Sequence, residues 1–211
     1  MRIQSVLDNL SNLLAQDYCY FCGGIEEIIC NNCILINLKL AKINYIQNVP
    51  VLTLTKKDQT FSKLITSYKD KGVSNLKIPF SKIIAVGLKH FSRHENVKVV
   101  NVPSPTKSIQ KRGLDPIGIM TKHACQIAGK RFIYEPNLLI NNQSRKDQSN
   151  LDHSQRKINM RFAFKSNFAE IKPVIIVDDL ITTGTTITES IRALNSQNIR
   201  VRGCVILTAN S

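Results

Sequence analysis

The sequence has no hydrophobic run long enough to cross a membrane. A helix that spans a bilayer needs about 18 or more consecutive apolar residues. No segment reaches that length, although 43% of the residues are hydrophobic. A signal peptide is not predicted either, because Asp8 interrupts the apolar positions of the N-terminal segment. We therefore expect a cytoplasmic protein without membrane insertion.

Acidic residues are also scarce. The chain has 15 Asp and Glu against 29 Lys and Arg, which gives a formal net charge of +14 at pH 7. An excess of basic residues attracts phosphate backbones and releases their counterions, so the charge favours nucleic-acid binding. A solvated, lysine-rich surface is the alternative interpretation.

Internal repeats and low-complexity tracts are absent. The 211 residues suffice for one substantial core with a small appended module. The residue pattern predicts a hairpin of strands 51–55 and 61–65, a helix over 76–91 and a buried strand over 97–102. The polar stretch 141–159 is expected to form a long loop.

The N-terminal region carries two closely spaced C-x2-C pairs, formed by Cys19, Cys22, Cys30 and Cys33. Two such knuckles close a tetrahedral thiolate site, so a structural zinc ion is predicted. Two disulfides are the alternative, which the absence of a signal peptide and two further cysteines in apolar stretches, Cys125 and Cys204, disfavour. With an amphipathic helix expected over 3–14, we predict an N-terminal module of residues 1–48 and a main domain of residues 49–211.

Residues 174–186 are the most informative segment. The apolar run from Val174 to Val177 predicts a buried strand that ends at two adjacent carboxylates, Asp178 and Asp179. The loop that follows consists of Leu180, Ile181, Thr182, Thr183, Gly184, Thr185 and Thr186. Hydroxyls and the free N–H groups of a following helix bind phosphate, and two carboxylates accept hydrogen bonds from a sugar diol. The segment therefore predicts a site for a phosphorylated sugar.

This pattern resembles the phosphoribosyl-pyrophosphate motif of the type I phosphoribosyltransferases. The resemblance implies an α/β fold with a parallel sheet flanked by helices, to which the four-cysteine zinc module and the β-hairpin are added. It also implies that Asp178 and Asp179, the predicted catalytic residues, contact the ribose hydroxyls, and that the loop from Leu180 to Thr186 holds the 5′-phosphate. Mg²⁺ would bridge the ribose hydroxyls and the pyrophosphate of the ligand. A strand that ends in magnesium-binding acids is the alternative.

In the same family, a loop after another strand meets pyrophosphate. Ser104, Thr106 and Lys107 follow the strand predicted over 97–102 and are therefore candidate pyrophosphate contacts. The prolines on either side of Ser104 offer a second explanation, since they restrict the chain to an extended turn. Further candidates are Arg112 and Arg145, the latter in a loop that is either a lid or a flexible connector.

Further short motifs resemble those of one branch, the ComF family of bacterial competence proteins. They are Tyr68 to Gly72, Lys111 to Leu114, Arg145, Gln148, Arg156, Asn159 and Phe164, in addition to the four cysteines. Two positions depart from the family pattern: Asp115-Pro116 replaces the usual Asn-Gln, and Ser104 stands where an apolar residue is usual. Both departures concern the pyrophosphate region.

The ComF resemblance implies a role in natural transformation, beside a helicase-like ATPase partner, with binding of phosphoribosyl pyrophosphate and single-stranded DNA. The candidate DNA contacts are Lys69, Lys71, Lys111, Arg112 and Arg156. No segment indicates an acceptor for the phosphoribosyl group, so turnover stays an open question. A metabolic phosphoribosyltransferase and a non-catalytic adaptor are the alternatives.

Overall fold

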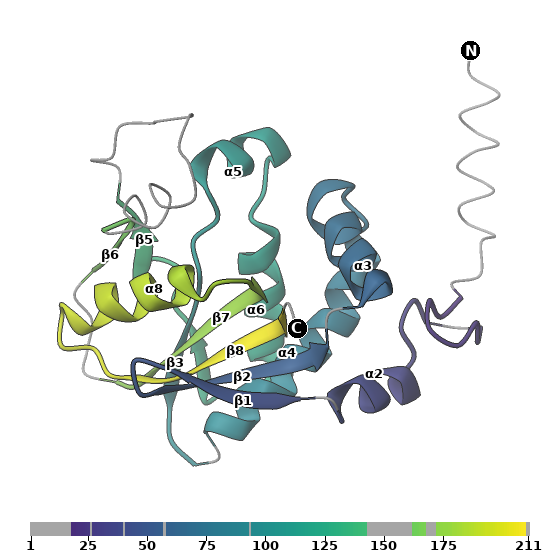
Figure 1. The fold of residues 1–211 in the computed structure, drawn as a ribbon, viewed down its shortest axis with the longest axis horizontal. Helices are drawn as coiled ribbons and strands as arrows, with labels where there is room; N and C mark the ends of the chain where they lie inside the picture. Colours follow the sequence, from purple (N-terminus) through teal and green to yellow (C-terminus); the bar gives the residue numbers. More distant parts are fainter. Residues whose placement is uncertain are drawn as a thin grey trace.

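A mostly parallel sheet forms the centre of the molecule (Figure 1). The computed structural model describes residues 18–25, 27–39, 41–56, 58–92, 94–142, 162–167 and 172–209. Within these residues, six strands join in the order β1-β2-β8-β7-β3-β4. Their bounds are β1 Lys42–Ile46, β2 Val49–Lys56, β3 Val97–Asn101, β4 Phe132–Tyr134, β7 Val174–Ile181 and β8 Val201–Ala209. β1 is antiparallel to β2 and the other neighbouring pairs are parallel, which confirms the predicted α/β class.

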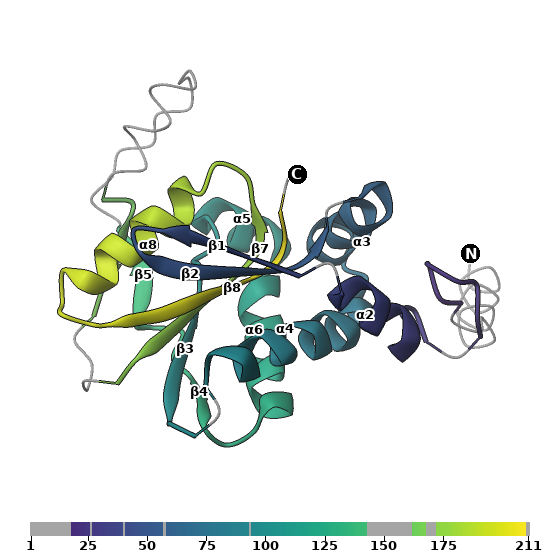
Figure 2. The same ribbon diagram turned by 60° about the horizontal axis from the view of Figure 1, so that its bottom comes forward.

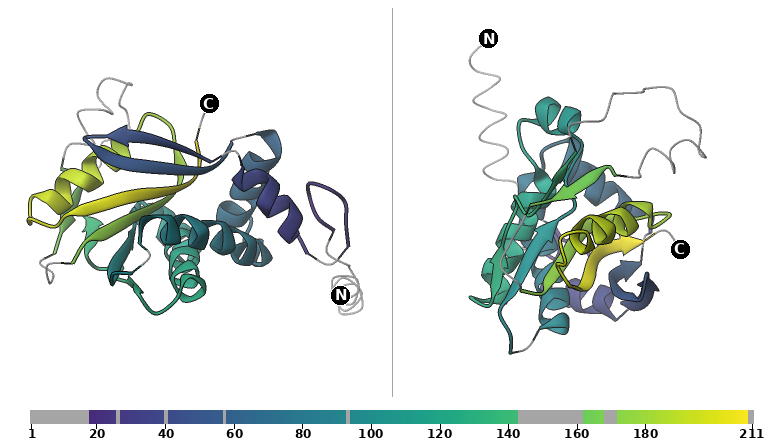
Figure 3. Two further views of the ribbon diagram at one scale, coloured as in Figure 1. Left: turned by 90° about the horizontal axis from the view of Figure 1, so that it is seen from below. Right: turned by 90° about the vertical axis from the view of Figure 1, so that its left-hand side faces the viewer.

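Helices cover both faces of this sheet. α4 (Lys77–Phe91) and α6 (Pro116–Ala128) pack on one face and α8 (Thr185–Asn195) on the other, as Figures 2 and 3 show. The side chains of β7 alternate between the two cores, so that Ile175 packs with α4 and α6 whereas Ile176 packs with α8. Because both faces of β7 are buried, the strand needs the continuous apolar run that its sequence has.

Shorter elements connect these layers. α3 (Gln59–Asp70) and the 3-10 helix η1 (Ser74–Leu76) lead from β2 to α4. α5 (Thr106–Arg112) stands between β3 and α6. Strands β5 (Leu139–Asn141) and β6 (Phe164–Ser166) form a separate antiparallel pair.

The predicted hairpin is wrong in its second strand. Residues 51–55 lie in β2 as expected, but residues 61–65 lie in α3. The carboxylate of Asp58 accepts from the backbone N–H of Phe61 at 2.7 Å and so begins the helix. The actual hairpin joins β1 to β2 through Gln47 and Asn48, whose φ angles of 49° and 62° suit a tight turn between twisted strands.

Two other sequence predictions are confirmed. The helix expected over 76–91 is α4, and the strand expected over 97–102 is β3. The predicted module boundary between residues 48 and 49 falls at the turn of the β1–β2 hairpin. The amphipathic helix predicted over 3–14 lies outside the described residues. Among the described helices, none combines the length and the apolar character that crossing a membrane requires.

Candidate functional site

The acidic pair lies at the carboxyl end of β7, beside the centre of the sheet. Asp178 and Asp179 are 8% and 5% exposed, and both still belong to the strand, which continues to Ile181. The sequence analysis placed the end of the strand at these acids, and the ladder with β8 extends it because Leu180 and Ile181 still pair with Thr208 and Ala209. The two carboxyl groups are therefore held on a rigid strand and not on a loop.

Burial affects the protonation of Asp178. Desolvation and, after it, the neighbouring charge of Asp179 raise the pKa of Asp178 well above its ordinary value. The Oδ1 atom of Asp178 accepts from the backbone N–H of Asp179 at 2.9 Å, which opposes this rise in part. The site thus favours the protonated form of Asp178.

Lys69 supplies a positive charge to the acidic pair. Its Nζ atom lies 2.9 Å from Asp179 Oδ2, and the two side chains are 27% and 7% exposed. Lys69 was a candidate DNA contact in the sequence, yet the structure directs its ammonium group to the predicted sugar site. This contact joins the last turn of α3 to the end of β7 across 110 residues of sequence.

The threonine loop joins β7 to α8. Gly184 precedes the first helical residue and has a φ of 74°, a conformation that glycine adopts without a steric penalty. The hydroxyls of Thr183 and Thr185 lie 2.9 Å apart, and the Thr183 hydroxyl accepts from the N–H of Thr185 at 3.4 Å. The loop thus gathers hydroxyl groups at the positive end of a helix dipole, where a phosphate is stabilised.

A cavity of about 800 Å³ brings nine of the predicted site residues together. Predicted residues in its lining are Lys69, Ser104, Thr106, Lys107, Asp178, Asp179, Leu180, Thr182 and Thr186. Ile181, Thr183, Gly184 and Thr185 continue the same strand and loop but are not among the described residues that line it. A volume of this size suits a drug-sized or nucleotide-sized ligand.

The loop between β3 and α5 is held by a buried polar network. Asp115 caps α6 and accepts from the Ser104 hydroxyl at 2.8 Å and from Asn101 Nδ2 at 3.0 Å. The Tyr134 hydroxyl completes the network by donating to Asn101 Oδ1 at 2.7 Å. The two departures from the ComF pattern, Ser104 and Asp115, are therefore partners in one hydrogen bond. They fix the shape of the loop between them, and the interpretation of 103–105 as a turn held by prolines alone is incomplete.

The basic candidate residues are dispersed around the cavity. Lys107 is exposed at its rim, and Lys71 and Lys111 are exposed on neighbouring elements. Arg112 pairs with Asp70 at 3.3 Å, and its buried Nη1 atom has no hydrogen-bond partner among the described residues. The remaining candidates, Arg145 and Arg156, lie outside the described residues.

The β5–β6 pair forms one wall of the cavity and is fastened to α8. Asn141 and Phe164 line the cavity. Arg192 donates from Nη2 to the carbonyl of Phe164 at 2.9 Å, and its guanidinium lies 4.7 Å from the ring centroid of Phe162. The same guanidinium binds the buried Glu189 through two hydrogen bonds of 2.9 and 2.8 Å. The helix that carries the threonine loop therefore also positions this wall.

Sequence reasoning missed the residues whose roles depend on distant contacts. The Lys69–Asp179 pair, the Asp115 network and the cavity wall formed by Asn141 had no local pattern that revealed them. The unusual Asp115-Pro116 step was the one available signal for the network.

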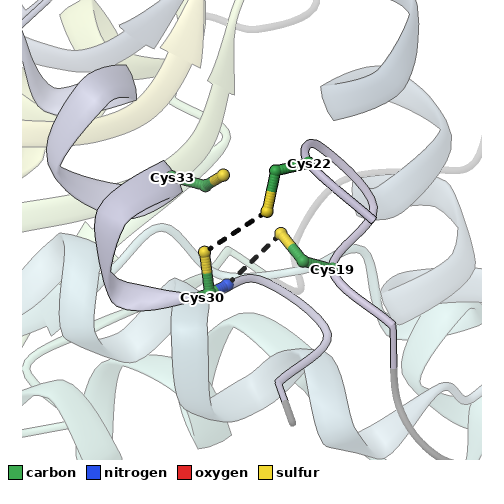
Figure 4. Close-up of side chains that lie close together, drawn as sticks. All are labelled: Cys19, Cys22, Cys30 and Cys33. Carbon is green, nitrogen blue, oxygen red and sulfur yellow. Dashed lines mark hydrogen bonds between the residues drawn. The ribbon is translucent and has the colours of Figure 1, made fainter. Parts of the chain in front are cut away.

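The four N-terminal cysteines form a compact cluster (Figure 4). Their four sulfur atoms all lie within 4.8 Å of one another, and Cys22 Sγ and Cys30 Sγ are 3.7 Å apart. Four thiolates around one zinc ion at about 2.3 Å would lie about 3.8 Å from each other. All six cysteines are free thiols, so the disulfide alternative is not what this arrangement forms. The four sulfurs are placed to bind a single structural metal ion such as zinc.

Local backbone structure aims these thiols inward. The N–H of Gly23 donates to the carbonyl of Cys19 at 2.8 Å, which closes the first knuckle. Cys30 and Cys33 are held by the start of α2 (Asn31–Leu38). Burial acts to raise the pKa of Cys19, but hydrogen bonds from the backbone N–H groups of Cys30, Cys22 and Phe21 outweigh it and lower the pKa to about 6. These donors favour the thiolate form, which is the form that binds metals.

The two remaining cysteines are ordinary core residues. Cys125 and Cys204 are 4% and 0% exposed. Burial raises the pKa of Cys125 to about 12, and burial with the nearby Asp178 carboxyl raises the pKa of Cys204 further above its usual range. Both therefore stay protonated and unreactive, as the sequence predicts.

Together, the doubly covered sheet, the threonine loop at its carboxyl edge and the adjoining cavity define an α/β protein whose site has the features that suit a phosphorylated ligand. Comparison with known families agrees, because residues 108–211 match the family model of the phosphoribosyl transferase domain. The matched residues contain the acidic pair, the threonine loop and α8. Lys69 lies outside the matched residues. A comparison with curated proteins found no match.

Proposed function

We propose that the protein binds phosphoribosyl pyrophosphate in the 800 Å³ cavity. The observation that carries this proposal is the convergence of the acidic pair and the threonine loop, both within the matched residues 108–211, on one cavity. Asp178 and Asp179 would accept from the two ribose hydroxyls, and Thr182 to Thr186 would hold the 5′-phosphate. Ser104 and Lys107 line the same cavity and would contact the pyrophosphate, for which Arg112 is also a proposed contact. Arg145 remains a further proposed contact.

Magnesium would enter this site with the ligand. Mg²⁺ keeps several waters and prefers phosphate oxygens, so the pyrophosphate of the ligand is its natural partner. The cysteine cluster is a separate site, for which we propose zinc in a structural role, because four thiolates leave no open coordination position.

We further propose a ComF-type role, in which the protein also binds single-stranded DNA during DNA uptake beside a helicase-like ATPase. The net charge of +14 supports this proposal, as do the exposed basic side chains of Lys71, Lys107 and Lys111 near the cavity. Lys69, Arg112 and Arg156 stay in the proposed DNA-binding set. Contacts between such residues and phosphates give an affinity that falls steeply with salt.

One calorimetric series tests both proposals. Phosphoribosyl pyrophosphate with Mg²⁺ is titrated into the protein alone, and then into the protein saturated with oligothymidylate. We expect binding in both cases, with an affinity that DNA alters because both ligands are anionic and lie close together. If the sugar ligand fails to bind the free protein, the cavity is not its site, and a non-catalytic adaptor becomes the better description.

A metabolic phosphoribosyltransferase is the second candidate function. A second cavity of about 390 Å³ favours it, because its lining shares Pro103, Ser104, Thr106 and Asn141 with the first cavity and offers space for an acceptor. The distinguishing measurement is pyrophosphate release in the presence of a series of bases and amines. Release that depends on one acceptor supports the enzyme, and no release with any of them favours the ComF-type role.

A further inference from the structure

Lys69 is a cation built into the ligand cavity. Its ammonium group lines the cavity and contacts Asp179 Oδ2 at 2.9 Å. An ammonium group is a compact, strongly hydrated point charge that binds a carboxylate oxygen in the way a small metal cation does. Within the described residues, the acidic pair therefore already has a counter-ion that the protein itself supplies.

The backbone on either side of Lys69 is anchored. The hydroxyl of Tyr68 donates to the carbonyl of Pro116 at 2.9 Å, which ties the end of α3 to α6. Asp70 pairs with Arg112 of α5 at 3.3 Å. Three consecutive residues at the end of α3 thus contact three different elements around the cavity. These contacts keep the root of the Lys69 side chain beside the carboxylate.

We propose that Lys69 occupies the cation position of the acidic pair, so that the pair binds the hydroxyls of a phosphorylated sugar and excludes a divalent metal ion. This inference rests on the proposed function for the identity of the sugar ligand. A divalent ion at Asp179 must displace the ammonium group or lie beside it, and repulsion at such short range in a partly buried site opposes both. A neutral diol meets no such repulsion, since it needs acceptors only, and each carboxyl group has a second oxygen.

The charge around the acidic pair is consistent with a site that binds a diol and excludes a divalent metal ion. Burial favours a neutral Asp178, and the ammonium group of Lys69 adds a positive charge, so the cluster is less negative than two free carboxylates. A cluster of that charge attracts Mg²⁺ weakly.

Mn²⁺, a spectroscopic substitute for Mg²⁺, tests the inference without any sugar ligand. Binding of Mn²⁺ to the full chain, with its cysteine site metal-loaded, is measured by electron paramagnetic resonance. We expect no Mn²⁺ site in the wild type at submillimolar Mn²⁺. Lys69→Met should gain one site, with an affinity for Mn²⁺ at least about tenfold higher than that of the wild type. Mn²⁺ does not displace zinc from the thiolates, because it is the weakest binder among the divalent first-row metals.

Three variants make the result specific. Lys69→Arg keeps the positive charge and should exclude Mn²⁺ as the wild type does. Lys63→Met removes one exposed charge from the same helix and should gain no site. Asp179→Asn added to Lys69→Met should abolish the new site, which locates it at the acidic pair.

The proposal is overturned if folded Lys69→Met, verified by its thermal unfolding, binds Mn²⁺ no better than the wild type, or if Lys63→Met gains as much. A companion titration uses ribose 5-phosphate, which has no pyrophosphate, in metal-free buffer. The wild type should bind it, and Lys69→Met should bind it about tenfold more weakly unless Mg²⁺ is added. If no variant binds any sugar phosphate while Lys69→Met still gains Mn²⁺, the proposed function fails and the role of Lys69 stands.

Discussion

The cysteine cluster and the cavity at the sheet edge are assembled in opposite ways. All four cysteines come from residues 19–33, and turns and the start of one helix place their sulfurs. The cavity instead draws on α3, the loop after β3, the β5–β6 pair and the end of β7. A local site is encoded by spacing, whereas a composite site requires the whole sheet to fold first. The two regions should therefore respond differently to mutation.

The largest expected effect is on the cysteine cluster. Cys22→Ser removes one of four thiolates, so we expect loss of the bound metal and loosening of residues 18–39, because metal binding and folding are coupled in such modules. Elemental analysis and hydrogen exchange measure both. Cys125→Ala is the matched control and should retain the metal. A full metal complement in Cys22→Ser would show that the cluster is not a four-thiolate site, and a loss of sugar-phosphate binding would show that the two regions are coupled.

Asp179→Asn should weaken binding of phosphoribosyl pyrophosphate by about 2 to 3 kcal/mol. The change removes a charged acceptor and leaves Lys69 without its partner, and hydrogen bonds to charged groups contribute about that much. Calorimetric titration gives the difference. Asp58→Asn is the control, because asparagine caps a helix about as well as aspartate. Equal affinities for the two variants would remove Asp179 from the sugar site.

Thr183→Val should preserve the fold and weaken ligand affinity by about 1 to 3 kcal/mol, because one phosphate oxygen loses its donor. The Thr183 hydroxyl also contacts that of Thr185 at 2.9 Å, so part of the loss reflects a looser loop. Thr66→Val, on the exposed side of α3, controls for the loss of a threonine hydroxyl. Unchanged affinity in Thr183→Val would mean that another group holds the phosphate.

Gly184→Ala should destabilise the fold by about 1 to 2 kcal/mol, the cost of a left-handed conformation for a residue with a side chain. Gly113→Ala is a close control, because both glycines have a φ of 74°. An added Cβ at Gly184 would lie 3.0 Å from Ile46 Cδ1, whereas at Gly113 it would meet nothing within 4 Å. Urea unfolding of both variants separates backbone strain from this contact. A Gly184→Ala variant more stable than Gly113→Ala would show that Ile46 accommodates the methyl group at a gain.

The smallest expected effect is an increase in the free energy of unfolding when Asp178 is replaced by asparagine. Because the pKa of Asp178 is raised in the folded state, the folded protein binds more protons than the unfolded chain above the ordinary value of 3.8. The free energy of unfolding should therefore fall as the pH rises from that value. Asp178→Asn should remove this contribution and stabilise the protein at neutral pH by about 0.5 to 2 kcal/mol. Urea unfolding at several pH values measures it, and a variant less stable than the wild type at neutral pH would contradict the raised pKa.

Local patterns allowed much of the fold to be predicted. The apolar run of β7, the helix α4 and the strand β3 were recognisable because periodicity and β-branched residues reflect burial directly. The strand expected over 61–65 failed because a short apolar run suits a helix or a strand equally. The Asp58 cap and the helical spacing of the buried residues decided for the helix.

The sequence alone determined the four-cysteine cluster and the order of strand, acidic pair and threonine loop. Each of these depends on residues only a few positions apart, whose relative placement follows from turns and strand geometry. Tertiary structure decided which charges meet: the pairing of Lys69 with Asp179, the bond between Ser104 and Asp115, and the tie from Arg192 to the β5–β6 wall. These contacts join segments far apart in the chain. Their formation depends on how helices pack on the two faces of the sheet, which no local pattern records.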